Sequence, residues 1–563
     1  MHTLTFYLAA LCLLCGTAGC APEPAPARPN LLLIVADDLG FTDLGCFGGE
    51  IRTPNLDALA REGIRATSFY TAPTCSPSRG MLFSGVDNHR CGYGTMEGDW
   101  AENQKGLRGY EGHLNFDVVA FPRLLLHAGY HTAIAGKWHQ AYPATEKKLW
   151  PDQRGFSRSF CLLQGGAGHF DDMQPLFSFY KNSLYVEDGR YLDQLPPGFY
   201  SSDFYTSKII QYIDESRQLE KPFFAMLSFT APHWPLQVPD EDIDRYKGRY
   251  DAGYEVLAAQ RLERAKKLGI IPPHTPLPER SPNVQPWEEL SPQAQKRAAR
   301  NMEIYAAMIE RLDANVGRLM QHLKQSGQYE NTLIVFMADN GAEGNNVLAI
   351  ADTEEWVARH FDNSYKNLGR KNSYTFTGPG WAQLSSLPFR WYKTFASEGG
   401  VRCPLIIRHP RAVQPPGSID EQLLSVMDIA PTFLEAAAVK HPGRTYQGRN
   451  IYPMDGRSML AYLRGKAQRV RPQDEAYCWE LYGRRGVRKG SWKATWLEPP
   501  YGKGAWELFD LSKDPSERRD LAAAQPAKLQ ELLAEWERYV QTYQLTLPSE
   551  PVAYGKETFW REP

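Results

Sequence analysis

Residues 31–38 read Leu-Leu-Leu-Ile-Val-Ala-Asp-Asp, a continuous apolar run that stops abruptly at two carboxylates. An unbroken apolar run of this length is typical of a strand that is buried on both faces of a sheet, because a half-exposed strand alternates apolar with polar residues. Asp37 and Asp38 would then lie at the carboxyl end of this strand. The stretch therefore predicts a central strand of a large sheet.

Three further apolar runs end in polar residues in the same way. They are Thr132 to Ala135 before Gly136-Lys137-Trp138-His139, Phe223 to Phe229 before Ala231-Pro232-His233, and Thr332 to Met337 before Asp339-Asn340-Gly341. Helical patterns lie between them, and the clearest begins at the cap Ser291 and ends near Gly327 with one apolar face. Strands that alternate with helices predict an α/β fold, whose ligand site lies beyond the carboxyl ends of the strands. The four polar clusters would meet there.

The chain changes character after about residue 465. Residues 475–481, 486–497 and 505–511 are predicted to form short antiparallel strands, and residues 527–543 a closing helix. We therefore expect a main domain over residues 30–465 and a smaller C-terminal subdomain over residues 466–563. The proline-rich residues 272–286 and the mixed segment 345–393 are expected to cross the surface or to shape the pocket.

The composition of the chain limits the classes of function that it can have. The chain has 563 residues, 42% of them hydrophobic and 23% charged, which is enough to bury a large core. Its 63 basic and 65 acidic residues give a net charge of −2. This balance argues against nucleic-acid binding and against a polybasic membrane surface.

The first 20 residues are predicted to be an export signal. An apolar run from Leu4 to Leu14, too short to span a bilayer, is followed by Gly16-Thr17-Ala18-Gly19-Cys20, which resembles a bacterial lipobox with lipid on Cys20. Thr17 stands where leucine is usual, and no Lys or Arg precedes Arg28. Residues 21–29 would form a proline-rich tether. We expect the protein in the periplasm or cell envelope, with a possible membrane tether through Cys20.

Cysteines beyond the leader are sparse. The six are Cys46, Cys75, Cys91, Cys161, Cys403 and Cys478. They are too few for a disulfide scaffold, and no CxxC spacing suggests a zinc site. Their pairing stays open at this point.

The polar clusters carry candidate chemistry. Asp37, Asp38, Asp339 and Asn340 offer only oxygen ligands, which suit calcium or magnesium better than zinc. Lys137 and His139 lie two residues apart in an extended segment, so both can face the same side of the strand end. His233 lies in a stiff loop between Pro232 and Pro235, and a histidine can serve as acid or base near neutral pH.

Cys75-Ser76-Pro77-Ser78-Arg79 is the most informative motif for function. Pro77 suits the first position of a helix, which would place Cys75 beside free N–H groups and the positive end of the helix dipole. Arg79 would follow one turn later. Such a site would hold an anionic ester.

The motif Cys-x-Pro-x-Arg resembles the site at which type I, formylglycine-dependent sulfatases modify their cysteine, and the body of the chain is most similar to bacterial arylsulfatases. The resemblance also rests on motifs in the family's order: Asp37-Asp38-Leu39-Gly40, Tyr110 to Asn115, Gly136 to His139, Ala231 to Pro235, Asp339 to Gly344, Gly378 to Gln383, and Lys393 ahead of Gly399-Gly400-Val401-Arg402. It implies an alkaline-phosphatase-like mixed sheet flanked by helices, with a smaller α+β subdomain that contains an antiparallel sheet.

The resemblance also implies roles for individual residues. One calcium ion would be bound by Asp37, Asp38, Asp339, Asn340 and the modified Cys75. A maturation enzyme would convert Cys75 to formylglycine, and Arg79 and Lys137 would hold its hydrate. Lys137, His233 and Lys393 would bind the sulfate.

The resemblance further implies the order of the chemical steps. One hydroxyl of the hydrate would attack sulfur while His233 or Lys393 protonates the leaving oxygen. His139 would then take a proton from the second hydroxyl. Gln140-Ala141 departs from the usual leucine-glycine.

The implied function is hydrolysis of sulfate monoesters, either aryl sulfates or sulfated carbohydrates. Two alternatives stay open. Phosphonate monoester or phosphodiester hydrolases can share this fold and the Cys75 motif. An exported lipoprotein that binds sulfated glycans without turnover would need the basic groups but not both acid–base groups. The natural substrate and the oligomeric state cannot be read from the sequence.

Overall fold

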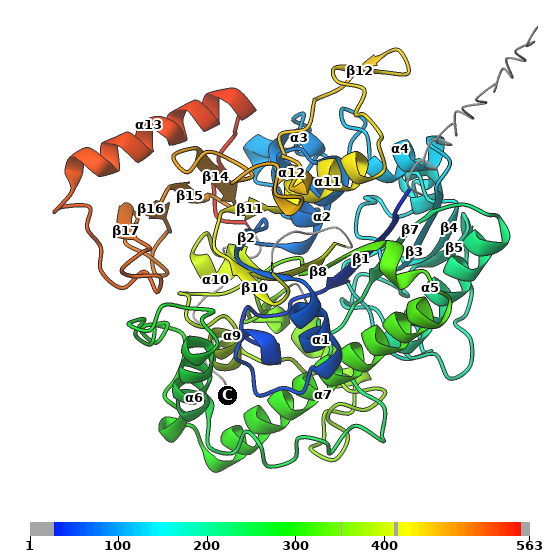
Figure 1. Cartoon of the computed structure of the whole chain (residues 1–563). Coiled ribbons are helices and arrows are strands. Elements are labelled where there is room, and N and C mark those ends of the chain that lie inside the picture. Colours follow the sequence, from blue (N-terminus) through cyan, green and yellow to red (C-terminus); the bar gives the residue numbers. More distant parts are fainter. Residues whose placement is uncertain (1–27, 351, 410–414, 553–563) are drawn as a thin grey trace, which may run out of the picture.

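A large mixed sheet with helices on both faces forms the body of the molecule (Figure 1). The computed structural model describes residues 28–350, 352–409 and 415–552. The predicted leader, Cys20 and most of the predicted tether therefore lie outside the described residues. The sheet follows the order β10-β2-β9-β8-β1-β7-β3-β4-β5-β6, and β11 pairs with β2. Its strands are β1 (Asn30–Ala36), β2 (Ile64–Tyr70), β3 (His131–Lys137), β4 (Arg158–Leu162), β5 (Tyr185–Glu187), β6 (Arg190–Tyr191), β7 (Phe223–Ser228), β8 (Thr332–Ala338), β9 (Arg402–Arg408), β10 (Ser418–Asp420) and β11 (Leu424–Ser425).

The four predicted strands lie side by side at the centre of this sheet. They are β8, β1, β7 and β3, each is parallel to its neighbour, and every residue in them is buried. Burial on both faces explains why each strand is an unbroken apolar run. Because the four strands are parallel, their carboxyl ends meet at one edge, as the sequence predicted.

The helices cover the two faces of the sheet. The longest, α7 (Pro292–Gln325), begins at the predicted cap, where the Ser291 hydroxyl accepts a hydrogen bond of 3.2 Å from the Ala294 N–H, and its predicted apolar face is buried. The other helices are α1 (Pro54–Glu62), α2 (Cys75–Ser84), α3 (Asn88–Cys91), α4 (Phe121–His127), α5 (Ser201–Gln218), α6 (Tyr254–Lys267), α8 (Thr353–His360), α9 (Pro379–Ser385), α10 (Glu398–Val401), α11 (Ile429–Ala436), α12 (Leu460–Leu463) and α13 (Pro526–Tyr543).

A separate antiparallel sheet follows, with the order β14-β15-β16-β17. Its strands are β14 (Ala476–Leu481), β15 (Arg484–Lys489), β16 (Trp492–Trp496) and β17 (Trp506–Asp510). One sequence prediction was wrong in detail, because residues 486–497 form two strands rather than one. The chain reverses at Gly490, whose φ of 61° suits a glycine in a tight turn. Helix α13 packs on this sheet through Leu532 and Trp536, at the left of Figure 1.

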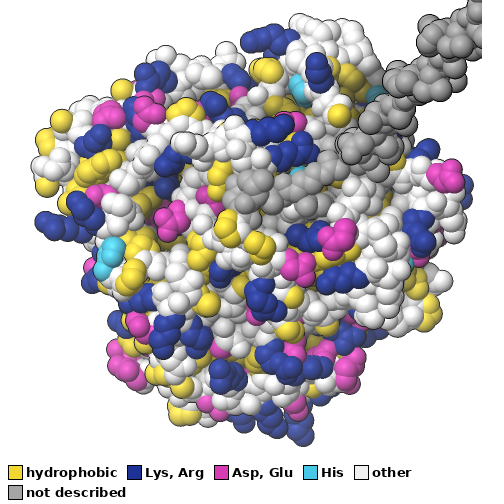
Figure 2. Space-filling model, in the orientation of Figure 1, with side chains coloured by type: hydrophobic (Ala, Val, Ile, Leu, Met, Phe, Trp, Pro, Cys, Tyr) yellow, Lys and Arg dark blue, Asp and Glu magenta, His cyan; other side chains and the backbone are white. Residues whose placement is uncertain are grey.

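The remaining segments are irregular. Residues 272–286 contain no helix or strand, while residues 345–393 contain α8 and α9. The six cysteines of the body are all unpaired within the described residues. Figure 2 shows acidic and basic side chains interspersed over the visible face. Among the described helices, none is both long and apolar enough to cross a membrane.

Candidate active site

The parallel pairing of β1 with β8 builds the first part of the site. Ala36 pairs with Ala338, so the acids that follow both strands emerge side by side. The Asp38 N–H lies 3.3 Å from an Asp339 carboxylate oxygen, and the Asn340 amide N–H donates to Asp38 at 2.7 Å. The side chains of Asp37, Asp38, Asp339 and Asn340 are all buried at this edge. The sheet register thus brings together residues that are about 300 positions apart.

Two lysines compensate this negative charge. The Lys137 ammonium, at the end of β3, lies 2.8 and 2.9 Å from the two Asp37 carboxylate oxygens. The Lys393 ammonium lies 3.0 Å from Asp38 and 3.0 Å from Glu343. Burial opposes ionisation of Asp38, but Lys393, His233 and Lys137 outweigh it and lower the pKa of Asp38 to about 2. Burial raises the pKa of Asp37, although Lys137 acts in the opposite direction.

Cys75 and Arg79 enter the site from helix α2. The helix begins at Cys75 itself, two residues before the predicted start at Pro77, which lies in the first turn, where its missing N–H costs no hydrogen bond. All ten residues of α2 are buried. The Cys75 sulfur lies with carboxylate oxygens of Asp37 and Asp339 in a group whose atoms are all within 4.8 Å of one another.

Arg79 ties the helix to the ends of three strands. Its guanidinium contacts Asp339 at 2.8 and 2.9 Å and donates to the Ser228 hydroxyl at 2.7 Å and to the Lys137 carbonyl at 3.2 Å. The side chain is fully buried. Although burial disfavours its charge, Asp339 and Asp37 raise the pKa of Arg79, so the guanidinium remains a fixed cation beside Cys75.

His233 approaches the acids from the loop after β7. Its Nδ1 lies 2.6 Å from the Trp234 carbonyl, so Nδ1 carries a proton, and its Nε2 lies 3.6 Å from Asp38. Burial lowers the pKa of His233 well below its usual range, and Lys393 and Lys137 lower it further. Asp38 and the hydrogen bond to the Trp234 carbonyl act in the opposite direction and favour the charged ring.

His139 is held differently from the prediction. Strand β3 ends at Lys137, and His139 has a φ of 53°, so the two residues do not alternate along one strand. The His139 Nε2 instead hydrogen-bonds Glu97, whose second oxygen accepts a 2.8 Å bond from the Ser76 hydroxyl. The His139 Nδ1 is buried without a partner in the described residues. Because the carboxylate keeps a proton on Nε2, Nδ1 is the nitrogen left to accept one.

Backbone strain accompanies these positions. Asp38, His139 and Thr394 have φ values of 64°, 53° and 77°, in the left-handed region that non-glycine residues rarely adopt. Each is itself a site residue or adjacent to one. Such strain persists only where the surroundings hold the residue in place, and it is concentrated at functional sites.

Glu97 and Glu343 were missed by sequence reasoning. Glu343 stands inside the quoted segment Asp339 to Gly344, but nothing in the sequence pairs it with Lys393. Glu97 lies in an irregular stretch between two short helices, and its contact with His139 spans 42 residues. Gln140, the departure noted above, is buried and donates to the Ser76 carbonyl at 3.0 Å. Gln140 therefore supports the turn beside Cys75.

The residues present fit a hard divalent cation. Asp37, Asp38 and Asp339 supply buried carboxylates, and the Asn340 side-chain oxygen is buried without a hydrogen bond in the described residues. An unpartnered amide oxygen among carboxylates is a donor set that calcium or magnesium accepts. Cys75 and His233 also lie close enough to join groups that could hold a metal.

Comparisons with known proteins identify the family of this chain. The sulfatase family profile matches residues 29–439, and a profile for the C-terminal part of N-sulphoglucosamine sulphohydrolase matches residues 388–544. The chain belongs to the sulfatase family. It is 43% identical to an uncharacterized sulfatase of Schizosaccharomyces pombe over 93% of this chain and 96% of that one. It is 41% identical to an arylsulfatase of Klebsiella aerogenes over 79% of this chain and 94% of that one.

Solved structures of this family confirm the fold. One of them, in complex with its substrate D-glucosamine-2-N,6-O-disulfate, superposes with a TM-score of 0.59 at 22% identity, over 94% of this chain and 100% of the other. The expected alkaline-phosphatase-like α/β fold with its C-terminal antiparallel sheet is therefore confirmed. This member of the sulfatase family is a sulfate ester hydrolase.

Replacing Glu97 by Gln should alter the pH dependence of turnover. Burial lowers the pKa of His139 and Glu97 raises it, so loss of the carboxylate should lower this pKa further. With His139 as the base, the acidic limb of the rate profile should move to lower pH. A positioned base contributes roughly 10²- to 10⁴-fold to the rate. Because Glu97→Gln should remove part of this contribution, the rate at the optimum should fall roughly 10- to 100-fold.

The control for this experiment is Glu102→Gln, which removes an exposed carboxylate of the same region that pairs with Lys105. Its pH–rate profile should match that of the unaltered protein. A Glu97→Gln profile with an unmoved acidic limb would show that Glu97 does not act through His139.

Proposed function

We propose that this sulfatase hydrolyses sulfate monoesters with formylglycine, made from Cys75, as nucleophile and with one bound calcium ion. One observation carries the proposal. Cys75 lies at the first turn of α2 in a buried group with Asp37 and Asp339, where Arg79 and Lys137 supply fixed positive charge. An anionic ester placed there would be held by cations that need no rearrangement.

In this proposal, formylglycine and calcium supply part of the chemistry, and the side chains of the protein supply the rest. Formylglycine hydrate supplies the attacking oxygen, and calcium supplies a Lewis acid that favours its deprotonated form. Asp37, Asp38, Asp339 and Asn340 would hold the cation through oxygen atoms. Arg79 and Lys137 would orient the nucleophile, since Arg79 follows Cys75 by one turn of α2 and contacts Asp339, and Lys137 contacts Asp37. His139, oriented by Glu97, would receive a proton at Nδ1.

The leaving oxygen needs a proton donor. His233 and Lys393 both contact Asp38, so both flank the same side of the carboxylate cluster. Nδ1 of His233 is committed to the Trp234 carbonyl, which leaves Nε2 to face the substrate. Burial lowers the pKa of His233, and the negative charge of a bound ester would act in the opposite direction and favour the protonated ring.

Two substrate classes have support. The Klebsiella relative is named an arylsulfatase, and the solved neighbour described above holds a disulfated glucosamine. We propose aryl sulfates or sulfated carbohydrates as substrates. Phosphonate or phosphodiester hydrolysis at the same site is the second candidate. Family membership weighs against the third, a binding protein without turnover.

The central test is the state of Cys75. Mass spectrometry of the peptide that contains it should find formylglycine when the protein is produced with a maturation enzyme. Cys75→Ala should lose turnover of 4-nitrophenyl sulfate, whereas Cys478→Ala, which alters a cysteine of the C-terminal sheet, should not. The unaltered enzyme should hydrolyse the aryl sulfate faster than an aryl phosphonate. Full activity with unmodified cysteine at position 75 would overturn the mechanism.

Calcium should be required and stoichiometric. Elemental analysis should find one calcium per chain, and its removal by chelation should abolish turnover until calcium is restored. Asp339→Ala should abolish turnover, because it removes an anionic ligand and the partner of Arg79. Asn340→Ala should weaken calcium binding without a change of charge. Stoichiometric zinc together with full activity after calcium removal would contradict this assignment.

His233→Ala should slow poor leaving groups most. A phenolate that is a weak base leaves without a proton, whereas an alkoxide or a sugar oxygen needs one. The rate for 4-nitrophenyl sulfate divided by the rate for phenyl sulfate should therefore be larger in the variant than in the unaltered enzyme. His360→Ala changes a histidine of α8 outside this cluster and serves as control. An equal fall for both substrates would mean that His233 positions sulfate instead of donating a proton.

Export is a further part of the proposal. Cleavage at Cys20 is supported by the short apolar run and by the sequence before Cys20. The proline-rich residues after Cys20 would form a tether that holds the domain away from the bilayer. Cys20→Ser should release the protein into the soluble fraction with unchanged specific activity. A soluble native protein that retains Met1 would refute both the anchor and the export.

A further inference from the structure

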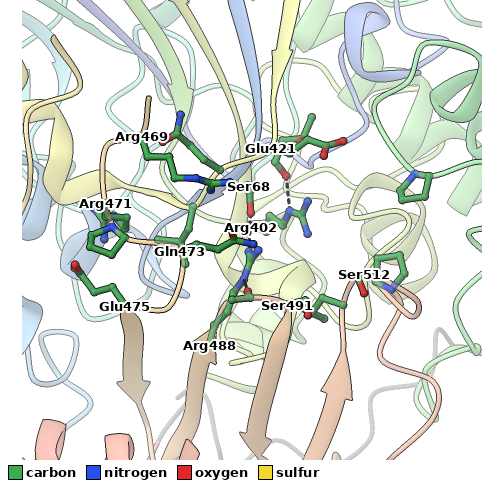
Figure 3. Close-up of a pocket in the computed structure, with 18 of the residues that line it drawn as sticks. Ser68, Arg402, Glu421, Arg469, Arg471, Gln473, Glu475, Arg488, Ser491 and Ser512 are labelled. Atoms are coloured by element: carbon green, nitrogen blue, oxygen red, sulfur yellow. Dashed lines mark hydrogen bonds between the residues drawn. The ribbon is translucent and has the colours of Figure 1, made fainter. Parts of the chain in front are cut away.

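A cavity of about 310 Å³ lies between the main sheet and the C-terminal sheet. We call it the arginine pocket and define it by Ser68, Arg402, Arg469, Arg471, Arg488 and Ser491 (Figure 3). Ser68 belongs to β2 and Arg402 begins β9, whereas Arg488 belongs to β15. Arg469 and Arg471 lie in the segment that joins the two sheets. Asp37, Asp38, Cys75 and the lysines of the active site are not among its lining residues.

Two of the four guanidinium groups are already compensated. Arg471 contacts both carboxylate oxygens of Asp428 at 2.5 Å. Arg402 contacts Glu398 at 3.3 Å and donates to the Thr67 carbonyl. These pairs fix the two side chains in place, so they form a rigid wall of the pocket.

Among the described residues, Arg488 donates its hydrogen bonds to neutral groups. It donates to the hydroxyls of Ser68 and Tyr70, both at 2.6 Å, and to the Gly490 carbonyl at 3.0 Å. No carboxylate in the described residues forms an ion pair with it. Glu398 is nearby, but it already contacts Lys493 at 3.0 Å and the Tyr70 hydroxyl at 2.6 Å. Figure 3 shows the Arg402 and Arg488 side chains near each other in the pocket.

Arg469 adds a second guanidinium group, whose charge acts on Asp420. Its side chain extends toward the same space in Figure 3, and it forms no ion pair with any residue that the structure describes. Two acids, Glu421 and Glu475, also line the pocket, but Glu475 contacts Arg457 at 2.6 Å. Among the residues that line the pocket, four arginines therefore stand against two acids.

We propose that the arginine pocket binds a tetrahedral oxyanion, a sulfate or phosphate group, held by Arg488 and Arg469. The planar fork of a guanidinium matches two oxygens of such a group, and hydroxyls such as that of Ser491 can donate to a third. The volume is at the lower end of the range for small-molecule sites, roughly 300–1,000 Å³, so an oxyanion carried on one sugar ring also fits. This inference does not depend on the reaction proposed for the active site.

Binding has a structural consequence. Ser68 and Arg402 belong to the main sheet and Arg488 and Ser491 to the C-terminal part, so one anion would bridge the two sheets. A ligand that binds only the folded protein raises its stability in proportion to the logarithm of the ligand concentration. Sulfate should therefore raise the unfolding temperature of the full chain beyond the effect of chloride at equal ionic strength.

The experiment uses Lys393→Ala protein, so that sulfate bound in the active site does not contribute. Calorimetric titration with inorganic sulfate and inorganic phosphate should show one site. Arg469→Gln should weaken it at least tenfold, and so should Arg488→Gln. Arg469 is exposed, so its variant tests the pocket even where Arg488→Gln fails to fold. Arg359→Gln removes an exposed arginine of α8 and controls for net charge.

Each outcome is decisive. Loss of binding in the two pocket variants, with binding retained in Arg359→Gln, supports the site. A sulfate affinity that Arg469→Gln leaves unchanged overturns it, as does stabilisation no greater than that given by chloride. Titration with a monosulfated monosaccharide separates the two sources of the anion: tighter binding than that of inorganic sulfate identifies a sulfated sugar, and equal or weaker binding identifies the free oxyanion. With Lys393 intact, Arg469→Gln should turn over 4-nitrophenyl sulfate at the normal rate.

Discussion

Acidic and basic side chains at the edge of the central strands are enclosed together with almost no access to water. They are Asp37, Asp38 and Asp339, and Arg79, Lys137 and Lys393, each at most 1% exposed. Leaving one such charge without its partner costs about 3–5 kcal/mol. The pairing of β1 with β8, the position of α2 and the path of the chain to Lys393 are therefore energetically linked. Each of these contacts therefore helps to hold the others in place.

Much of this could be predicted from local sequence. Each central strand is an unbroken apolar run because both of its faces are covered, and a polar residue follows where the strand leaves the sheet. That pattern places Asp37 and Asp339 at one edge without any knowledge of the partner strand. Ser291 and Gly327 delimit α7 for equally local reasons, namely capping and a left-handed turn. Cys75 and Lys393 needed the family's motifs, since no periodic pattern identifies them.

The errors and omissions have a common cause. Glu97 and Glu343 act through contacts that depend on where loops come to rest, and loop positions leave no periodic trace in the sequence. The sequence predicts one strand over residues 486–497, although the run Arg488-Lys489-Gly490-Ser491 interrupts the alternation of apolar and polar residues at the turn. It also predicts an extended segment through His139, whereas β3 ends two residues earlier. For Glu97, Glu343 and His139, tertiary contacts decide the local conformation.

The burial of α2 constrains the order of events in the cell. Every residue from Cys75 to Ser84 is covered, and Cys75 is 3% exposed. Under the mechanism proposed above, an enzyme that oxidises Cys75 would need access to its thiol, which the folded protein covers. The proposed modification would therefore have to take place before the sheet closes over the helix. Maturation and folding are then competitors in time, and a chain that folds too quickly would remain permanently unconverted.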